Sequence, residues 1–304
     1  MLKISDINKN NSNLELELKK DYVLAKKNEA FEKLVSKLKV KEETLMKYTS
    51  QLEDSAIEYS NCLKCDGLNC CQNKINGYAY LPIIKEKGLD FSYKACKYKE
   101  KETKETKYLK NVYYLDIPEN IKVARMRDIL TNDLARYDII KYLKAFINEP
   151  SQNKGLYLHG NFGCGKTYLI TAAFNELAKK DVKSAIVFWP EFLKRLKASF
   201  SNDFAGEFEQ LITKIKKSPL LLIDDIGAEN MTAWGRDEIL CPILQYRMDE
   251  NLKTFFTSNL NLEELETHLS LTKDGVDLVK AKRIIERIKQ LTIDSEMIGQ
   301  NLRK

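Results

Sequence analysis

The sequence lacks two features that would place it in other classes of protein. None of its apolar runs approaches the roughly 20 residues that a membrane-spanning helix needs. Its first residues, MLKISDINKNNSNLELELKK, contain no apolar core followed by a small-residue cleavage site, so they do not resemble a signal peptide. We therefore expect a cytoplasmic protein with no membrane segment, in which the seven cysteines stay reduced.

Arginine is absent before Arg125, although the 304 residues carry 50 Lys and Arg against 44 Asp and Glu. Residues 59–110 hold 11 lysines and 6 acidic residues. Arg binds phosphates and bases through two parallel hydrogen bonds, whereas Lys acts as a point charge. The N-terminal part is therefore expected to contact protein rather than to read nucleic acid, unless its lysines only solvate the surface.

Two patterns divide the first part of the chain. Residues 1–60 carry apolar stripes at helical spacing, such as Phe31, Leu34 and Leu38, which predict short amphipathic helices. Residues 61–98 instead contain a cysteine cluster, scattered glycines and short apolar runs. The stretch KYKEKETKETKYLK (97–110) has nothing to bury and predicts a solvated linker. We place the domain boundary there, with one domain over residues 1–107 and a second over 108–304.

The second domain alternates short apolar runs with helical stretches. Strands are predicted at GLYLHG (155–160), AIVFWP (185–190), PLLLIDDIG (219–227) and TFFTSNL (254–260), with helices between them. The continuous apolar run before Asp224 is what a strand buried on both faces requires. This pattern predicts a three-layer α/β domain built on a mostly parallel sheet.

The stretch GNFGCGKT fits G-x-x-x-x-G-K-[ST] and lies between a predicted strand and a predicted helix. In this motif the backbone N–H groups surround the phosphates, the Lys reaches the β- and γ-phosphates, and the Thr hydroxyl binds Mg²⁺. We expect an ATP and Mg²⁺ site here; a chance glycine-rich turn is the alternative. Its residues are Gly160, Asn161, Phe162, Gly163, Cys164, Gly165, Lys166 and Thr167.

Polar residues follow two further predicted strands. Asp224 and Asp225 end the most apolar strand, where a P-loop enzyme holds its magnesium shell. We assign Asp224 to magnesium and Asp225 to the attacking water, with Glu229 as the alternative base. Asn259 follows the next predicted strand and could orient that water, or it could only form a turn.

These motifs, in the order GNFGCGKT, LLLIDDIGAE, ILQYRM, TFFTSN and AKRIIERI, resemble the AAA+ domain of bacterial replicative helicase loaders of the DnaC and DnaI family. The similarity covers about residues 150–304. It extends to the N-terminal part, because loaders of the DnaI type carry a cysteine-rich zinc module before the ATPase domain. The resemblance implies a P-loop AAA+ domain preceded by a small, mainly helical zinc-binding domain.

The resemblance also implies roles for single residues. Asn259 becomes the sensor-1 residue, and Arg287 becomes the arginine finger presented to the ATP of a neighbouring subunit. Arg283 lies one helical turn before Arg287 and could serve instead, and a solvated helix face would explain both. Arg303 is a weaker candidate for the sensor-2 arginine.

The cysteine module is expected at about residues 61–98. Cys62-x-x-Cys65 has the spacing of a metal knuckle, Cys70 or Cys71 can return to it, and Cys96 follows. We choose Cys71, which gives a four-cysteine Zn²⁺ site. The family tends to place a histidine between the central and last cysteines, but residues 72–95 contain none. Buried inert thiols are the alternative, and Cys164 and Cys241 are taken as structural.

The resulting hypothesis is an ATP-dependent helicase loader of the primosome. The resemblance implies that the zinc-bearing domain binds the hexameric replicative helicase, while the AAA+ domain hydrolyses ATP, binds single-stranded DNA and self-associates through the arginine finger. Two alternatives are the ATPase subunit of a transposition system and a zinc-binding adaptor whose nucleotide site is only a scaffold.

Overall fold

The chain forms two compact units. The computed structural model describes residues 4–86, 88–129, 134–199, 205–273 and 275–302. The units are Met1–Thr106 and Lys107–Lys304, so the division falls one residue before the boundary placed from composition. Among the described residues, no helix has both the length and the apolar character needed to cross a membrane.

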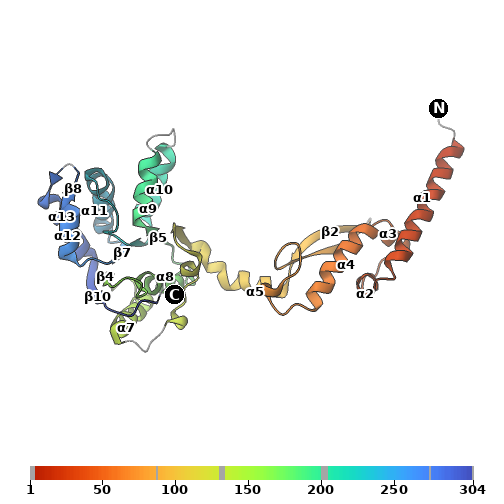
Figure 1. Ribbon diagram of the computed structural model, residues 1–304, viewed down its shortest axis with the longest axis horizontal. Coiled ribbons are helices and arrows are strands. Elements are labelled where there is room, and N and C mark those ends of the chain that lie inside the picture. The colour runs from red at the N-terminus through yellow and green to blue at the C-terminus, as the bar shows by residue number, and fades with distance from the viewer. Residues whose placement is uncertain (1–3, 87, 130–133, 200–204, 274, 303–304) are drawn as a thin grey trace. The chain divides into compact units, whose positions relative to one another are not determined.

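The first unit combines helices with one β-hairpin (Figure 1). Tyr22, Phe31, Leu34, Leu52 and Leu89 are buried together in its core. The stripes seen in the sequence therefore face inward as expected. Its elements are α1 (Ile4–Ala25), α2 (Glu29–Val35), α3 (Glu42–Met46), α4 (Thr49–Leu63), β1 (Tyr78–Lys85), β2 (Gly88–Ala95) and α5 (Lys97–Thr106).

The charged stretch that the sequence predicts to be a linker begins as a helix. None of the residues of α5 is buried, as expected from their charge. Lys and Glu are good helix formers, and pairs such as Lys99 with Glu102 lie one turn apart on the helix surface. A solvated segment can therefore be helical without a core to pack against.

The second unit is built on a six-stranded parallel sheet with the strand order β10-β4-β7-β6-β5-β3. The strand predicted at 185–190 ends earlier, because Trp189 and Pro190 open the next helix, and proline is tolerated in a first turn. The strands are β3 (Val112–Leu115), β4 (Gly155–Gly160), β5 (Ser184–Phe188), β6 (Leu220–Asp224), β7 (Lys253–Ser258) and β10 (Thr292–Met297).

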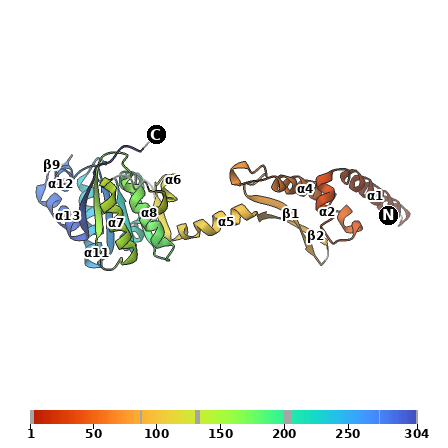
Figure 2. The ribbon, with the colours of Figure 1, turned by 90° about the horizontal axis from the view of Figure 1, so that it is seen from below.

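Helices cover both faces of this sheet (Figure 2). Side chains along β6 alternate between two cores: Leu221 and Ile223 enter the first, and Leu220 and Leu222 the second. The first core contains residues of α9 (Trp189–Ser199), α10 (Ala205–Lys217), α11 (Cys241–Asp249), α12 (Leu262–Ser270) and α13 (Leu278–Leu291). The second contains residues of α7 (Leu134–Asn148) and α8 (Lys166–Ala178). The predicted three-layer α/β class is confirmed.

The strand order determines where a ligand can bind. Strands β4, β7 and β6 are neighbours and run parallel, so their carboxyl ends meet at one edge of the sheet. The P-loop follows β4, Asp224 ends β6, and Asn259 follows β7. Open α/β sheets bind ligands in the crevice at this edge.

Candidate nucleotide and metal sites

The P-loop links β4 to α8 in the conformation that the motif requires. Gly163 and Gly165 have φ values of 72° and 97°, which favour glycine, and Gly165 caps α8. A Cβ on Gly160 would lie 2.1 Å from the carbonyl oxygen of Met297 in the neighbouring strand. Glycine is therefore required at 160 for strand packing and at 163 and 165 for the turn.

Lys166 bridges the loop and the third strand. Its Nζ donates to the carbonyl oxygens of Gly160 and Asn161 at 2.8 and 2.7 Å, and to Oδ1 of Asn259 at 2.9 Å. The side chain is buried, with 8% of the residue exposed. The ammonium group thus lies in the pocket and donates to three uncharged oxygen atoms, which phosphate oxygens could replace.

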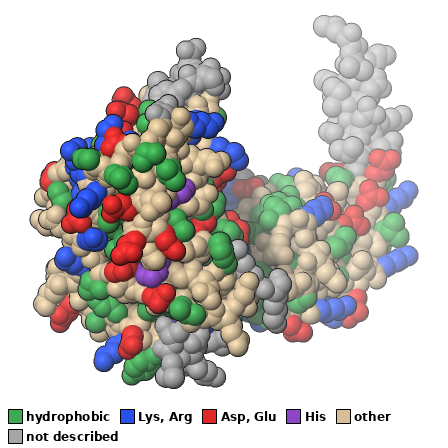
Figure 3. Space-filling model, turned by 60° about the vertical axis from the view of Figure 1, so that its left-hand side comes forward, with side chains coloured by type: hydrophobic (Ala, Val, Ile, Leu, Met, Phe, Trp, Pro, Cys, Tyr) green, Lys and Arg blue, Asp and Glu red, His purple; other side chains and the backbone are tan. Residues whose placement is uncertain are grey.

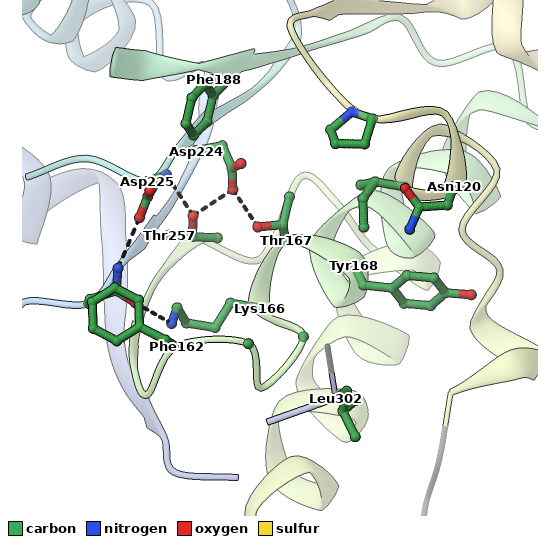
Figure 4. Close-up of a pocket in the computed structure, with 15 residues that line it drawn as sticks. Asn120, Phe162, Lys166, Thr167, Tyr168, Phe188, Asp224, Asp225, Thr257 and Leu302 are labelled. Carbon is green, nitrogen blue, oxygen red and sulfur yellow. Dashed lines mark hydrogen bonds between the residues drawn. The ribbon is translucent and has the colours of Figure 1, made fainter. Parts of the chain in front are cut away.

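Asp224 lies opposite the start of α8 (Figure 4). Its Oδ1 accepts hydrogen bonds from the hydroxyls of Thr167 at 2.7 Å and Thr257 at 2.6 Å. Burial raises the pKa of Asp224 to about 6, and nearby Asp225 acts in the same direction, against the two threonine hydrogen bonds. The carboxylate of Asp224 and the hydroxyl of Thr167 are oxygen donors in contact at this edge of the sheet, and Mg²⁺ prefers oxygen ligands.

Asp225 is held in a less common backbone conformation beside Asp224. Its φ is 58°, its N–H donates to Oγ1 of Thr257 at 2.9 Å, and its Oδ1 accepts from Nδ2 of Asn259 at 3.1 Å. Asn259 thereby connects Lys166 to Asp225. The structure brings together all five residues that the sequence assigned to phosphate, magnesium and water.

Glu229, the alternative base, points elsewhere. Its Oε2 accepts from the backbone N–H of Gly227 at 2.8 Å, and its Oε1 lies 3.6 Å from Nε2 of His268 on α12. It is buried and is not among the residues that line the nucleotide pocket. This arrangement braces the loop after β6.

The pocket has a volume of about 790 Å³. Sequence motifs identified part of its lining but missed residues that reach it from other elements. Thr257 carries a signal, because it lies two residues before Asn259 on the same strand. No pattern points to the rest: Pro118, Asn120, Ile121, Tyr168, Phe188 and Leu302.

The arginines proposed for contacts between subunits lie on α13, away from the pocket. Arg287 is half-buried against α11: its Nε donates to Oε1 of Gln245 at 2.9 Å and its Nη1 to Sγ of Cys241 at 2.8 Å. Arg283 is exposed. Arg303 lies outside the described residues.

The cysteines of the first unit gather at the open end of the hairpin. Cys62, at the end of α4, lines a cavity of about 290 Å³ with Cys65, Cys71 and Cys96. Cys70 is exposed; it does not line this cavity, and its Sγ lies 3.9 Å from Sγ of Cys65. No group of three or more His, Cys, Asp or Glu side chains among the described residues is arranged to hold a metal ion.

The donors around these sulfurs suit thiolates. The side-chain amide of Asn73 donates to Sγ of Cys62 and the N–H of Gly77 to Sγ of Cys71, both at 3.3 Å. Hydrogen bonds of this kind orient and stabilise the side chains that bind a metal. Burial raises the pKa of the Cys62 thiol, so a metal would have to displace its proton. The residue types fit zinc, whereas the side-chain arrangement is not that of a bound site.

Comparison with known proteins places the chain in a family. A model of the bacterial DnaA ATPase domain matches residues 132–274. The replicative helicase loader DnaI of Bacillus subtilis (strain 168) is 35% identical over 272 residues, which cover 87% of this chain and 84% of that protein. The chain belongs to the DnaI family of replicative helicase loaders. The motif-based resemblance is confirmed.

Solved structures agree with this assignment. A crystal structure of DnaI is 42% identical, with a TM-score of 0.56, and covers 65% of this chain and 100% of the solved chain. A protein from Streptococcus pyogenes serotype M3, described as a candidate primosome component, is 31% identical with a TM-score of 0.55 and covers 65% and 98%. The second unit is thus an AAA+ ATPase-type domain of the DnaI family, and the transposition alternative gains no support.

Proposed function

We propose that this protein delivers the hexameric replicative helicase onto single-stranded DNA at the start of replication, with ATP as the switch. The observation that carries this proposal is the match to a helicase loader over 87% of the chain, which extends beyond the ATPase unit into the first. The convergence of Lys166, Thr167 and Asp224 on one pocket supports an active nucleotide site rather than a degenerate scaffold.

In the proposed ATP complex, Lys166 leaves Asn259 and the loop carbonyls for the β- and γ-phosphates. Thr167 and Asp224 would hold Mg²⁺, and Asp225 would accept a proton from the water that attacks the γ-phosphorus as the bond to the leaving ADP breaks. Asn259, released from Lys166, orients that water. ATP binding then rearranges the Lys166–Asn259–Asp225 chain, and we infer slow hydrolysis that a partner stimulates. Ordering of a segment by the γ-phosphate is a common way to switch a partner contact.

We further propose that Cys62, Cys65, Cys71 and Cys96 hold one structural Zn²⁺, which would contribute folding energy to the hairpin end of the first unit. Asn73 and the N–H of Gly77 would orient two of the thiolates. Cys71 is favoured over Cys70 because it lines the cavity that the other three cysteines share.

The two units are proposed to bind different partners. The first unit, without arginine, would bind helicase. The second, with all nine arginines, would bind single-stranded DNA and a further copy of itself. Exposed Arg283 is better placed than half-buried Arg287 to reach a neighbouring ATP.

On the face in Figure 3, basic and acidic side chains are interspersed rather than separated by sign.

The aromatic residues proposed to stack on DNA bases are Phe200, Phe204 and Trp234, and core packing would explain each of them equally well. Trp234 is half-buried and packs against the core of the second unit. Phe200 and Phe204 lie outside the described residues. Binding carried by phosphate contacts would weaken steeply as salt is raised.

The test is to express residues 1–106 and 107–304 separately and to measure each against the host replicative helicase and a labelled oligonucleotide, with and without ATP. We expect helicase to bind the first piece and the oligonucleotide to bind the second. A first piece that binds the oligonucleotide but not helicase would contradict this division of functions.

A further inference from the structure

Two consecutive carbonyl groups of the P-loop are held by residues far away in the sequence. The carbonyl oxygen of Gly163 accepts a hydrogen bond from the backbone N–H of Leu302 at 2.9 Å. The carbonyl oxygen of Cys164 accepts one from Nη2 of Arg136 at 3.0 Å. Neither contact belongs to the P-loop motif.

These contacts orient the phosphate-binding side of the loop. A trans peptide is planar, with its C=O and the following N–H pointing in opposite directions. Fixing the carbonyls of Gly163 and Cys164 therefore fixes the N–H groups of Cys164 and Gly165. N–H groups in this part of a P-loop bind phosphate oxygens. An N–H group that is already oriented loses no conformational freedom when the anion arrives.

Arg136 occupies a buried position that the proposed chemistry does not explain. It lies on α7 with 4% of its surface exposed, and it is not among the residues lining the nucleotide pocket. It lines instead a cavity of about 260 Å³ together with Cys164 and Leu302. Placing a guanidinium in such a site costs solvation free energy unless it makes good hydrogen bonds. The P-loop carbonyl is one of its acceptors.

The C-terminal segment is positioned by the sheet. Strand β10 pairs with β4 so that Met297 lies opposite Gly160, the first residue of the P-loop motif. The chain then crosses the loop so closely that Oδ1 of Asn301 lies 2.0 Å from the place of a Cβ on Gly163. The approach of this segment is thus built into the fold. Glycine at 163 is favoured by its φ of 72°, whereas the Asn301 side chain could move away from a Cβ.

We propose that Arg136 and the backbone N–H of Leu302 are positioning groups for nucleotide binding, which hold the P-loop N–H groups in the orientation that phosphate needs. This inference rests on the proposed nucleotide site. The C-terminal segment would then help to bind phosphate. Helix α7 would also contribute to nucleotide binding, although none of its residues lines the pocket.

The test measures affinities for ATP and for adenosine, by competition against a fluorescent ATP analogue in Mg²⁺ buffer, on the full chain. Leu302→Pro removes the N–H donor, and Gln300→Pro stiffens the same segment without removing it. Arg136→Met keeps an apolar stem but no donor, and Arg195→Met makes the same change at a surface position on α9. Unfolding midpoints without nucleotide verify that each variant folds.

We expect about tenfold weaker ATP binding for Leu302→Pro and for Arg136→Met. Each substitution leaves one P-loop N–H group poorly oriented for its charge-assisted hydrogen bond to phosphate. Adenosine, which has no phosphate, should lose much less affinity than ATP in each variant, and both controls should keep wild-type ATP affinity. If Arg136→Met does not fold, Leu302→Pro decides the matter.

ATP affinities of the folded variants within twofold of wild type would overturn the inference. Equal losses for ATP and adenosine would also overturn it, because the residues would then shape the base side of the pocket. A wild-type protein that fails to bind ATP would instead remove the nucleotide site itself, so the two failures can be told apart.

Discussion

Asp224 is buried, and its proposed role in binding Mg²⁺ requires a charged carboxylate. Its pKa of about 6 exceeds the ordinary 3.8, so the folded protein keeps this proton to higher pH than the unfolded chain. The stabilisation that this gives is complete below pH 3.8 and is lost as pH rises through about 6. Near neutral pH the bare carboxylate therefore destabilises the fold while making it ready for Mg²⁺.

Asp224→Asn should consequently raise the free energy of unfolding at pH 7.5, in the absence of nucleotide and Mg²⁺, by up to about 3 kcal/mol. The amide oxygen can still accept both threonine hydroxyls. The gain should vanish near pH 3.5, and Mg²⁺-dependent ATP binding should be lost. Denaturant unfolding at the two pH values checks this. A variant less stable than wild type at pH 7.5 would contradict the burial argument.

Asp225 and Glu229 differ in where their carboxylates point, which makes a paired substitution informative. Asp225→Asn should slow ATP hydrolysis about 100-fold, the lower range for loss of a general base, with ATP affinity nearly unchanged. Glu229→Gln should leave the hydrolysis rate within a few-fold, because Glu229 braces Gly227 and His268. Single-turnover hydrolysis, with the protein in excess of ATP and above its Kd for ATP, measures both rates. The reverse pattern would move the base to Glu229.

Local motifs predicted the residues proposed to bind phosphate and magnesium, which the structure brings into one pocket, because that chemistry fixes both residue type and spacing. They could not predict Arg136 or Leu302, whose contacts with the P-loop span 28 residues and more than a hundred, respectively. The left-handed φ of Asp225 was equally hidden, because it depends on Thr257 and Asn259 from a neighbouring strand.

At the scale of elements, the sequence predicted the buried strands best. The run LLLID is apolar because β6 is covered on both faces. The edge strand β3 and the hairpin of β1 and β2 were not identified, since half-buried strands carry mixed residues. The helix α5 was missed because amphipathic periodicity cannot identify a helix that buries nothing.

The cysteines at the open end of the hairpin allow a direct test of the proposed metal site. Freshly reduced protein should contain one zinc per chain, and Cys62→Ser or Cys71→Ser should release it and make residues 1–106 sensitive to protease. Cys70→Ser is the matched control, since this exposed thiol lies off the shared cavity, and it should keep its zinc. Metal analysis and limited proteolysis measure both effects. Loss of zinc from Cys70→Ser with retention by Cys71→Ser would exchange the two assignments, and wild-type protein without zinc would remove the site.

At the scale of the whole molecule, a unit without arginine is joined to a unit that carries the proposed nucleotide switch. The family match spans both units, and in the proposed function the first unit holds the helicase while the second responds to ATP. The protein is therefore expected to act only as the full chain.

The most direct measurement is helicase loading on closed circular single-stranded DNA carrying an annealed labelled strand, with the host replicative helicase as the only other protein. The full chain with ATP should stimulate displacement of the labelled strand at least tenfold over helicase alone. Lys166→Ala, which lacks the phosphate-binding ammonium, should not stimulate it. Equal displacement with and without the protein, under conditions where the helicase unwinds a linear fork normally, would contradict the loader function.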